Sequence, residues 1–171
     1  VYLLTATFLT GIIMIFSKNY IHREKGYKRF FNNIKFFYLG LLLVLVAGNL
    51  ETIFLGWEIL GVTSFFLIGF YRDRYLPVKN ALKVVSLYRV ADVAILLGIW
   101  LSHHYFGYSI NFKDLDGLHS PHDHIVNESI YLYLIPGLFL LAAMVKSAQF
   151  PFSSWLPRAM EGPTTSSSIF Y

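Results

Sequence analysis

The sequence contains no cysteine and few charged residues. The absence of cysteine excludes disulfides, thiolate metal sites and cysteine-held iron–sulfur clusters from this chain. Charged residues make up 14% of the sequence, against about 25% in soluble proteins. Hydrophobic residues make up 56% and aromatic residues 18%. We therefore expect lipid, and not water, to surround most of the chain.

Long apolar runs predict an all-α integral membrane protein, a bundle of about five to six transmembrane helices. A helical span needs roughly 20 apolar residues, and the expected spans cover residues 1–17, 30–48, 50–71, 78–102 and 130–155, with the start of another after 163. We interpret residues 1–171 as a single membrane domain. We also expect it to be an internal fragment of a longer multi-span subunit, because the chain starts inside an apolar helix.

Basic residues alternate between the two sides of the expected bundle. The first loop and its flank hold Lys18, Arg23, Lys25, Lys28 and Arg29, and the third loop region holds Arg72, Arg74, Lys79 and Lys83. The short turn at 48–51 between them holds none. The positive-inside rule places the two basic loops on the cytoplasmic side or its equivalent. The net charge of +4 comes from these loops, so no nucleic-acid partner is expected.

Lys146 stands inside the apolar run 131–155, shortly before Pro151. A lysine at bilayer depth costs on the order of 3 kcal/mol. Pro151 has no N–H for the carbonyl of Ser147, and its ring crowds that carbonyl, so we predict a discontinuous helix near Pro151. Such breaks are tolerated at membrane depth where protein or a wet cavity surrounds them. Lys146 and the nearby Gln149 are therefore candidates for an ion path.

Two further spans carry ionisable residues. Glu58 lies near the middle of the third span, and Gly61 one turn later predicts a close approach of a neighbouring helix. Glu51 shares the face of Glu58 and is expected to be solvated at the interface. The fourth span carries a polar stripe formed by Lys79, Lys83, Ser86, Arg89 and Asp92.

These charges allow more than one interpretation. A lysine can release its proton when a nearby carboxylate loses influence, whereas an arginine stays charged. This favours proton transfer between Glu58 and Lys146. A purely structural Glu58–Lys146 bridge is an alternative. Arg89 and Asp92 can pair along one helix face, which is compatible with either a structural or a functional role.

The segment 108–127 is the one polar stretch, and it contains His119, His122 and His124. The His-x-His spacing can ligate zinc or copper. The surrounding proline and glycine favour an outward-facing solvated loop, so no metal site is expected.

Three motifs resemble the antiporter-like subunits of respiratory complex I, in the branch of chain 5 (chain L). They are Gly56-Trp57-Glu58-Ile59-Leu60-Gly61, Arg89-Val90-Ala91-Asp92, and the run KSAQFPFSSWLPRAMEGPT from Lys146 to Thr164. The similarity covers essentially the whole chain, from about the third to the early eighth helix of a protein with more than twelve. The branch also includes large cation/proton antiporter subunits and inorganic-carbon-uptake subunits.

The resemblance implies roles for individual residues. Glu58 corresponds to the paired carboxylate and Lys146 to the proton-carrying lysine, while Asp92, Arg89 and Lys83 modulate charge. Pro151 corresponds to the helix-breaking proline. The implied function is proton translocation by a non-redox subunit of an NADH:quinone oxidoreductase-type complex, in a bacterial plasma membrane or an organelle inner membrane. Redox chemistry then belongs to partner subunits, and no cofactor is expected in this chain.

Two positions depart from the family pattern. Thr165 replaces a proline, and Tyr171 replaces a histidine of the proton path. Tyrosine titrates near 10 and histidine near 6.5, so Tyr171 is expected to relay protons through a water chain instead of by its own titration. The departures leave room for a divergent branch such as an inorganic-carbon-uptake subunit. A cation/proton antiporter and a structural scaffold subunit stay open as further alternatives, with either protons or sodium as the transported ion.

Overall fold

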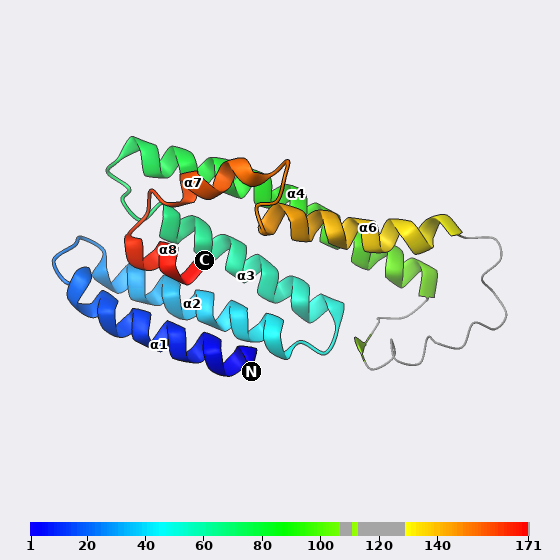
Figure 1. The fold of residues 1–171 in the computed structure, drawn as a ribbon, viewed down its shortest axis with the longest axis horizontal. Helices are drawn as coiled ribbons and strands as arrows, with labels where there is room; N and C mark the ends of the chain where they lie inside the picture. The colour runs from blue at the N-terminus through cyan, green and yellow to red at the C-terminus, as the bar shows by residue number, and fades with distance from the viewer. Residues whose placement is uncertain (107–110, 113–128, 171) are drawn as a thin grey trace.

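The computed structural model describes residues 1–106, 111–112 and 129–170. The described part is helical and confirms the expected all-α membrane bundle (Figure 1). Its elements are α1 (Tyr2–Tyr20), α2 (Tyr27–Val46), α3 (Leu50–Ile68), α4 (Tyr75–Phe106), α6 (Ser129–Lys146), the 3-10 helix η1 (Ser153–Trp155), α7 (Leu156–Ala159) and α8 (Thr164–Phe170). Helices α1, α2, α3 and α4 are long and apolar enough to cross a membrane.

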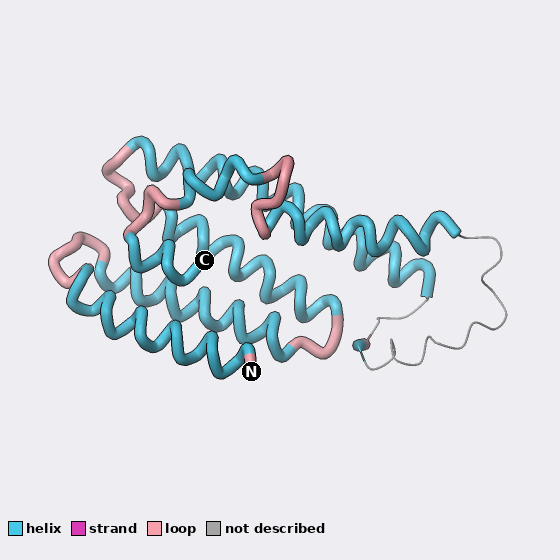
Figure 2. The backbone as a smooth tube through the Cα atoms, in the orientation of Figure 1, coloured by secondary structure: helices cyan, strands magenta, loops and turns pink. Residues whose placement is uncertain are grey.

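The four long helices run up and down beside one another, and α6 returns along the second half of α4 (Figures 1 and 2). The α1–α2 and α3–α4 loops therefore meet at one end of the bundle, at the left of Figure 1. We call this the basic end, because it carries the two lysine- and arginine-rich loops. The short α2–α3 turn lies at the opposite end.

Glycines bring α2 and α3 into close contact. A Cβ on Gly56 would stand 2.8 Å from the carbonyl oxygen of Gly40, so neither position has room for a side chain. The turn between the helices ends at Asn49, whose Oδ1 accepts a hydrogen bond from the Thr52 N–H at 2.9 Å and caps α3. The sequence analysis did not predict this contact at Gly40 and Gly56; at Gly61, where it predicted a close approach, the atom nearest to an added Cβ is Lys146 Nζ.

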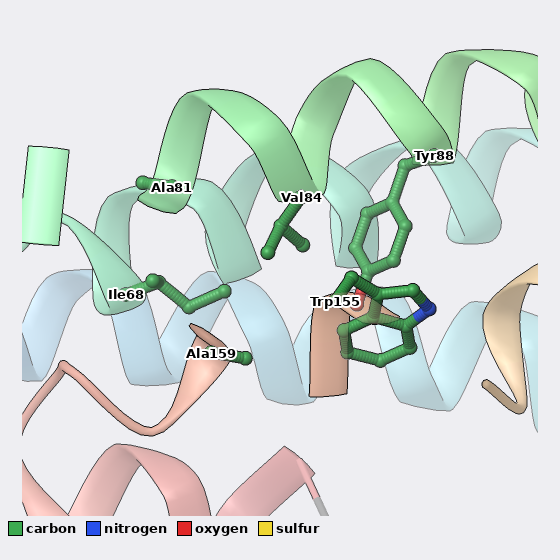
Figure 3. Close-up of a cluster of buried hydrophobic side chains, with 6 residues drawn as sticks. All are labelled: Ile68, Ala81, Val84, Tyr88, Trp155 and Ala159. Atoms are coloured by element: carbon green, nitrogen blue, oxygen red, sulfur yellow. The ribbon is translucent and has the colours of Figure 1, made fainter. Parts of the chain in front are cut away.

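Residues 130–155 do not form one continuous helix, in keeping with the predicted break. Helix α6 stops at Lys146, and η1 and α7 continue along the first half of α4 (Figure 1). A buried apolar cluster joins the two parts of the chain: Tyr88 of α4 and Trp155 of η1 point toward each other (Figure 3). Their rings meet edge to face, with centroids 5.1 Å apart. This contact positions the segment after the break.

Candidate functional site at the helix break

Helix α6 ends in a left-handed turn. The Gln149 N–H donates to the Met144 carbonyl at 3.0 Å, and the Ala148 N–H donates to the Val145 carbonyl at 3.3 Å. These two bonds, with φ of 53° at Ala148, make the C-terminal pattern in which glycine or asparagine is usual. An alanine in this conformation costs about 1–2 kcal/mol. Backbone strain of this kind gathers at functional sites, and here it directly follows Lys146.

The break starts before Pro151 and is closed by Trp155. The Phe150–Pro151 peptide bond is cis, and the chain then turns into η1. The indole N–H of Trp155 reaches back to donate to the Val145 carbonyl at 2.8 Å. That carbonyl belongs to the last turn of α6, where helix geometry leaves acceptors unsatisfied. The helix is discontinuous near Pro151, as predicted, but regular helix already ends at Lys146, before the proline.

The ammonium group of Lys146 lies against two aromatic rings. Its Nζ is 3.9 Å from the ring centroid of Tyr88 on α4 and 5.1 Å from that of Trp57 on α3. A Cβ on Gly61 would stand 3.2 Å from the same nitrogen. Gly61 therefore makes room for the lysine head, and α3, α4 and α6 meet around it. Ring faces and the C-terminal end of α6 both favour a positive charge at this point.

An acidic pair lies on the adjoining turns of α3 and α4. Arg89 Nη1 is 2.9 Å from Glu58 Oε2 and 3.3 Å from Asp92 Oδ2, so one guanidinium bridges both carboxylates. Asp92 is buried, and its Oδ1 accepts a hydrogen bond from the Trp57 indole N–H at 3.0 Å. Trp57 thus contacts the acidic group through its N–H edge and Lys146 through its ring face. Asp92 and Glu58 lie within electrostatic range of the ammonium.

The structural Glu58–Lys146 bridge, the alternative that the sequence left open, is not formed. In the described part of the chain, both ion pairs within 4.0 Å belong to Arg89. Arg89 reaches both carboxylates because it sits one helical turn from Asp92 on α4 and faces α3. Lys146 lies against the rings of Trp57 and Tyr88.

Other predicted residues lie outside this cluster. Lys83 is exposed on α4 and Gln149 is exposed beyond the end of α6. Glu51 was expected to be solvated, but its Oε2 is buried without a hydrogen-bond partner, because α4 residues Leu96 to Trp100 flank it in an apolar cavity. Tyr171 and the histidine loop fall outside the described residues.

Sequence reasoning did not single out Trp57 and Tyr88 as site residues. The spacing of two residue pairs in the sequence could have indicated them. Trp57 and Gly61 are four residues apart, as are Tyr88 and Asp92, so each pair shares one helix face. A glycine one turn from a broad ring leaves a space next to that ring. A space with an aromatic wall suits a buried cation.

Comparison with known protein families shows to which family the chain belongs. A family model described as "NADH:quinone oxidoreductase/Mrp antiporter, TM" matches residues 47–171. The chain belongs to this family. A second model, described as "NADH-Ubiquinone oxidoreductase (complex I), chain 5 N-terminus", matches residues 1–31. The resemblance to the chain 5 branch is thereby confirmed, and membership places the chain in an integral membrane protein.

Individual relatives agree with the family assignment. NADH-quinone oxidoreductase subunit L of Neisseria meningitidis serogroup A is 38% identical over 95% of this chain and 26% of its own length. The chloroplastic NAD(P)H-quinone oxidoreductase subunit 5 of Digitalis grandiflora is 39% identical over 95% of the chain and 24% of its own length. The chain thus spans about a quarter of the length of these curated relatives.

Proposed function

We propose that the chain contributes a proton-carrying site to a proton-translocating subunit of an NADH:quinone oxidoreductase-type complex. The observation that supports it is the placement of Lys146. Its ammonium is partly buried between three membrane helices, next to a helix break, with two carboxylates close by on α3 and α4. Intramembrane ionisable residues in such surroundings commonly mark proton relays.

In this proposal Lys146 is the group that gains and loses the proton. Arg89 cannot do so, because a guanidinium stays charged. Its role is to hold Glu58 and Asp92 together, which sets how much negative charge acts on Lys146. When Arg89 shifts toward or away from either carboxylate, the electrostatic preference for a charged lysine changes in step. The protons enter and leave through parts of the subunit beyond this chain, and the redox reaction is assigned to partner subunits.

The test uses the full-length subunit in its assembled complex, reconstituted into liposomes. We expect Lys146→Arg to preserve assembly, because arginine also binds aromatic faces as a cation. It should nevertheless lower the number of protons pumped per NADH oxidised, because arginine does not release a proton at neutral pH. Lys146→Ala should lower it as well. Lys18→Ala, an exposed lysine in the last turn of α1, is the matched control and should pump normally.

The outcomes separate the proposal from its alternatives. Full proton pumping by assembled complexes that carry Lys146→Arg would rule out Lys146 as the carrier. Loss of assembly in Lys146→Ala, with normal pumping in Lys146→Arg, would identify a structural role. The matched family model also names an antiporter, so the assay is repeated with a sodium gradient. Sodium-dependent flux that is lost in Lys146→Arg would assign the site to cation exchange.

A further inference from the structure

A polar cavity of about 500 Å³ lies at the basic end of the bundle, away from Lys146. The loops 21–26 and 69–74, which join α1 to α2 and α3 to α4, form it together. We propose that this cavity binds the phosphate group of an anionic phospholipid. The proposal does not depend on proton transfer at Lys146, because it concerns the membrane surface and not the interior.

The charge of the cavity suits an anion. Two acidic side chains, Glu24 and Asp73, stand against five basic ones in its lining: Arg23, Lys25, Arg29, Arg72 and Arg74. Across the residues that the structure describes, the ion pairs within 4.0 Å involve Arg89 alone. Within the described residues, no carboxylate therefore neutralises the five cations at close range, so they can attract an anionic ligand. Clustered basic side chains beside transmembrane helices bind anionic headgroups in this way.

Two of the arginines lie against neighbouring parts of the loops. Gly26 adopts φ of 107°, and the Arg29 guanidinium lies so close that a Cβ on Gly26 would stand 2.9 Å from one of its nitrogens. Arg74 stacks over the ring of Tyr71, with Cζ 4.8 Å from the centroid. Side chains that are already placed lose less freedom on binding. An arginine fork also matches the geometry of phosphate oxygens.

The position of the cavity favours a lipid over a free anion. It lies at the ends of α1 and α3 and at the start of α2, which is the level where a spanning bundle meets the headgroups. Aromatic residues line its base: Phe70 is buried and packs edge to face on Phe30, and Tyr71 lies beside it. Aromatic rings at this level are typical of the membrane interface. The basic loops also mark the side whose leaflet carries anionic lipids.

The experiment measures lipid retained by the full-length protein in its assembled complex. Complexes are delipidated, placed in nanodiscs of phosphatidylcholine with added phosphatidylglycerol, and analysed by native mass spectrometry. The double variant Arg29→Gln with Arg72→Gln should retain roughly tenfold less phosphatidylglycerol than the wild type. Lys28→Gln is the matched control, since Lys28 is exposed on the same turn of α2 but does not line the cavity. It should retain phosphatidylglycerol normally.

Four results would overturn the proposal. The first is an equal loss in Lys28→Gln, which would indicate general attraction to the surface. The second is a wild type without preference for phosphatidylglycerol over phosphatidylcholine. The third is displacement of the lipid by millimolar inorganic phosphate, which would indicate a site for free anions. The fourth is unchanged retention in Glu24→Gln, because this substitution removes a repelling carboxylate and should raise the amount of lipid retained. If the double variant does not assemble, the absence of a rise in Glu24→Gln decides against the site.

Discussion

The Lys146 ammonium lies against two ring faces, and in the described part of the chain no carboxylate lies within 4.0 Å of it. Each ring contact contributes from about 0.5 kcal/mol to about 2 kcal/mol when water is excluded. The carbonyl end of α6 adds a further favourable interaction. Trp57 joins the two halves of the site, because its ring faces Lys146 and its N–H binds Asp92. The two functions of this one side chain can be separated by mutation.

Trp57→Phe keeps an aromatic face beside Lys146 and removes the hydrogen bond to Asp92. We expect a loss of about 1–3 kcal/mol in stability, because a buried carboxylate loses its donor. Unfolding of the full-length subunit in detergent, followed by far-ultraviolet circular dichroism, measures it. Trp57→Leu removes both functions and should also reduce proton pumping more strongly than Trp57→Phe. Equal stability of Trp57→Phe and wild type would show that the bond to Asp92 carries little weight.

Tyr71 provides a pH-dependent prediction outside the membrane spans. Burial raises the pKa of the Tyr71 phenol above 10.0, and the nearby Glu24 carboxylate raises it further. The folded protein thus keeps this proton where the unfolded chain has lost it, so stability falls as the pH rises above about 10. Ultraviolet titration of tyrosinate, with Tyr71→Phe subtracted, should show a late midpoint. Glu24→Gln should move this midpoint to lower pH; a midpoint that stays in place would exclude the Glu24 contribution.

Among the elements, the α2–α3 pair depends on two glycines, and the α4–α6 pair depends on a buried cluster of small and aliphatic side chains: Ala91, Ala94, Ile95, Ala142 and Val145. In the first pair, the backbones themselves are in contact at Gly40 and Gly56. Small residues permit this approach in membranes, where the lipid gives no hydrophobic drive for association. The second pair packs through small and aliphatic side chains, and Trp155 adds a contact at the break, where it binds the end of α6 and packs on Tyr88 of α4.

Gly56→Ala should weaken the α2–α3 contact by about 1–3 kcal/mol, because the added methyl group meets backbone atoms that cannot move aside. Chemical unfolding of the full-length subunit measures the change. Gly11→Ala is the control, since a Cβ there meets nothing within 4 Å. It should be neutral or slightly stabilising, as alanine favours helix. Equal effects of the two substitutions would contradict the close packing.

At the scale of the whole molecule, the two basic loops lie at one end and the α2–α3 turn at the other. This agrees with the alternation of charge that the sequence shows. The chain contains no cysteine, so single cysteines can report its orientation. In a full-length protein without other cysteines, Asp73→Cys should react with a membrane-impermeant maleimide from the cytoplasmic side or its equivalent. Gly48→Cys should react only from the opposite side, and labelling of both from one side would refute the arrangement.

The sequence predicted the features that depend on local chemistry. Apolar runs indicated the helices, Pro151 indicated the break, and Arg89 with Asp92 indicated a pair one turn apart. The partners across helices were not predictable in the same way, because they depend on how α3, α4 and α6 rotate when they pack. Glu58 therefore meets Arg89 and not Lys146, and one carboxylate oxygen of Glu51, Oε2, is buried beside α4.

The cation–π attraction between Lys146 and its two rings requires a protonated amine. An aromatic face attracts a cation through its quadrupole and offers little to a neutral amine. In the proposed proton transfer, a neutral lysine head would lose this attraction, and the adjoining Gly61 has no side chain that would oppose its movement. Under the proposed function, Tyr88 and Trp57 would therefore hold the lysine head more firmly when it carries a proton than after the proton has left.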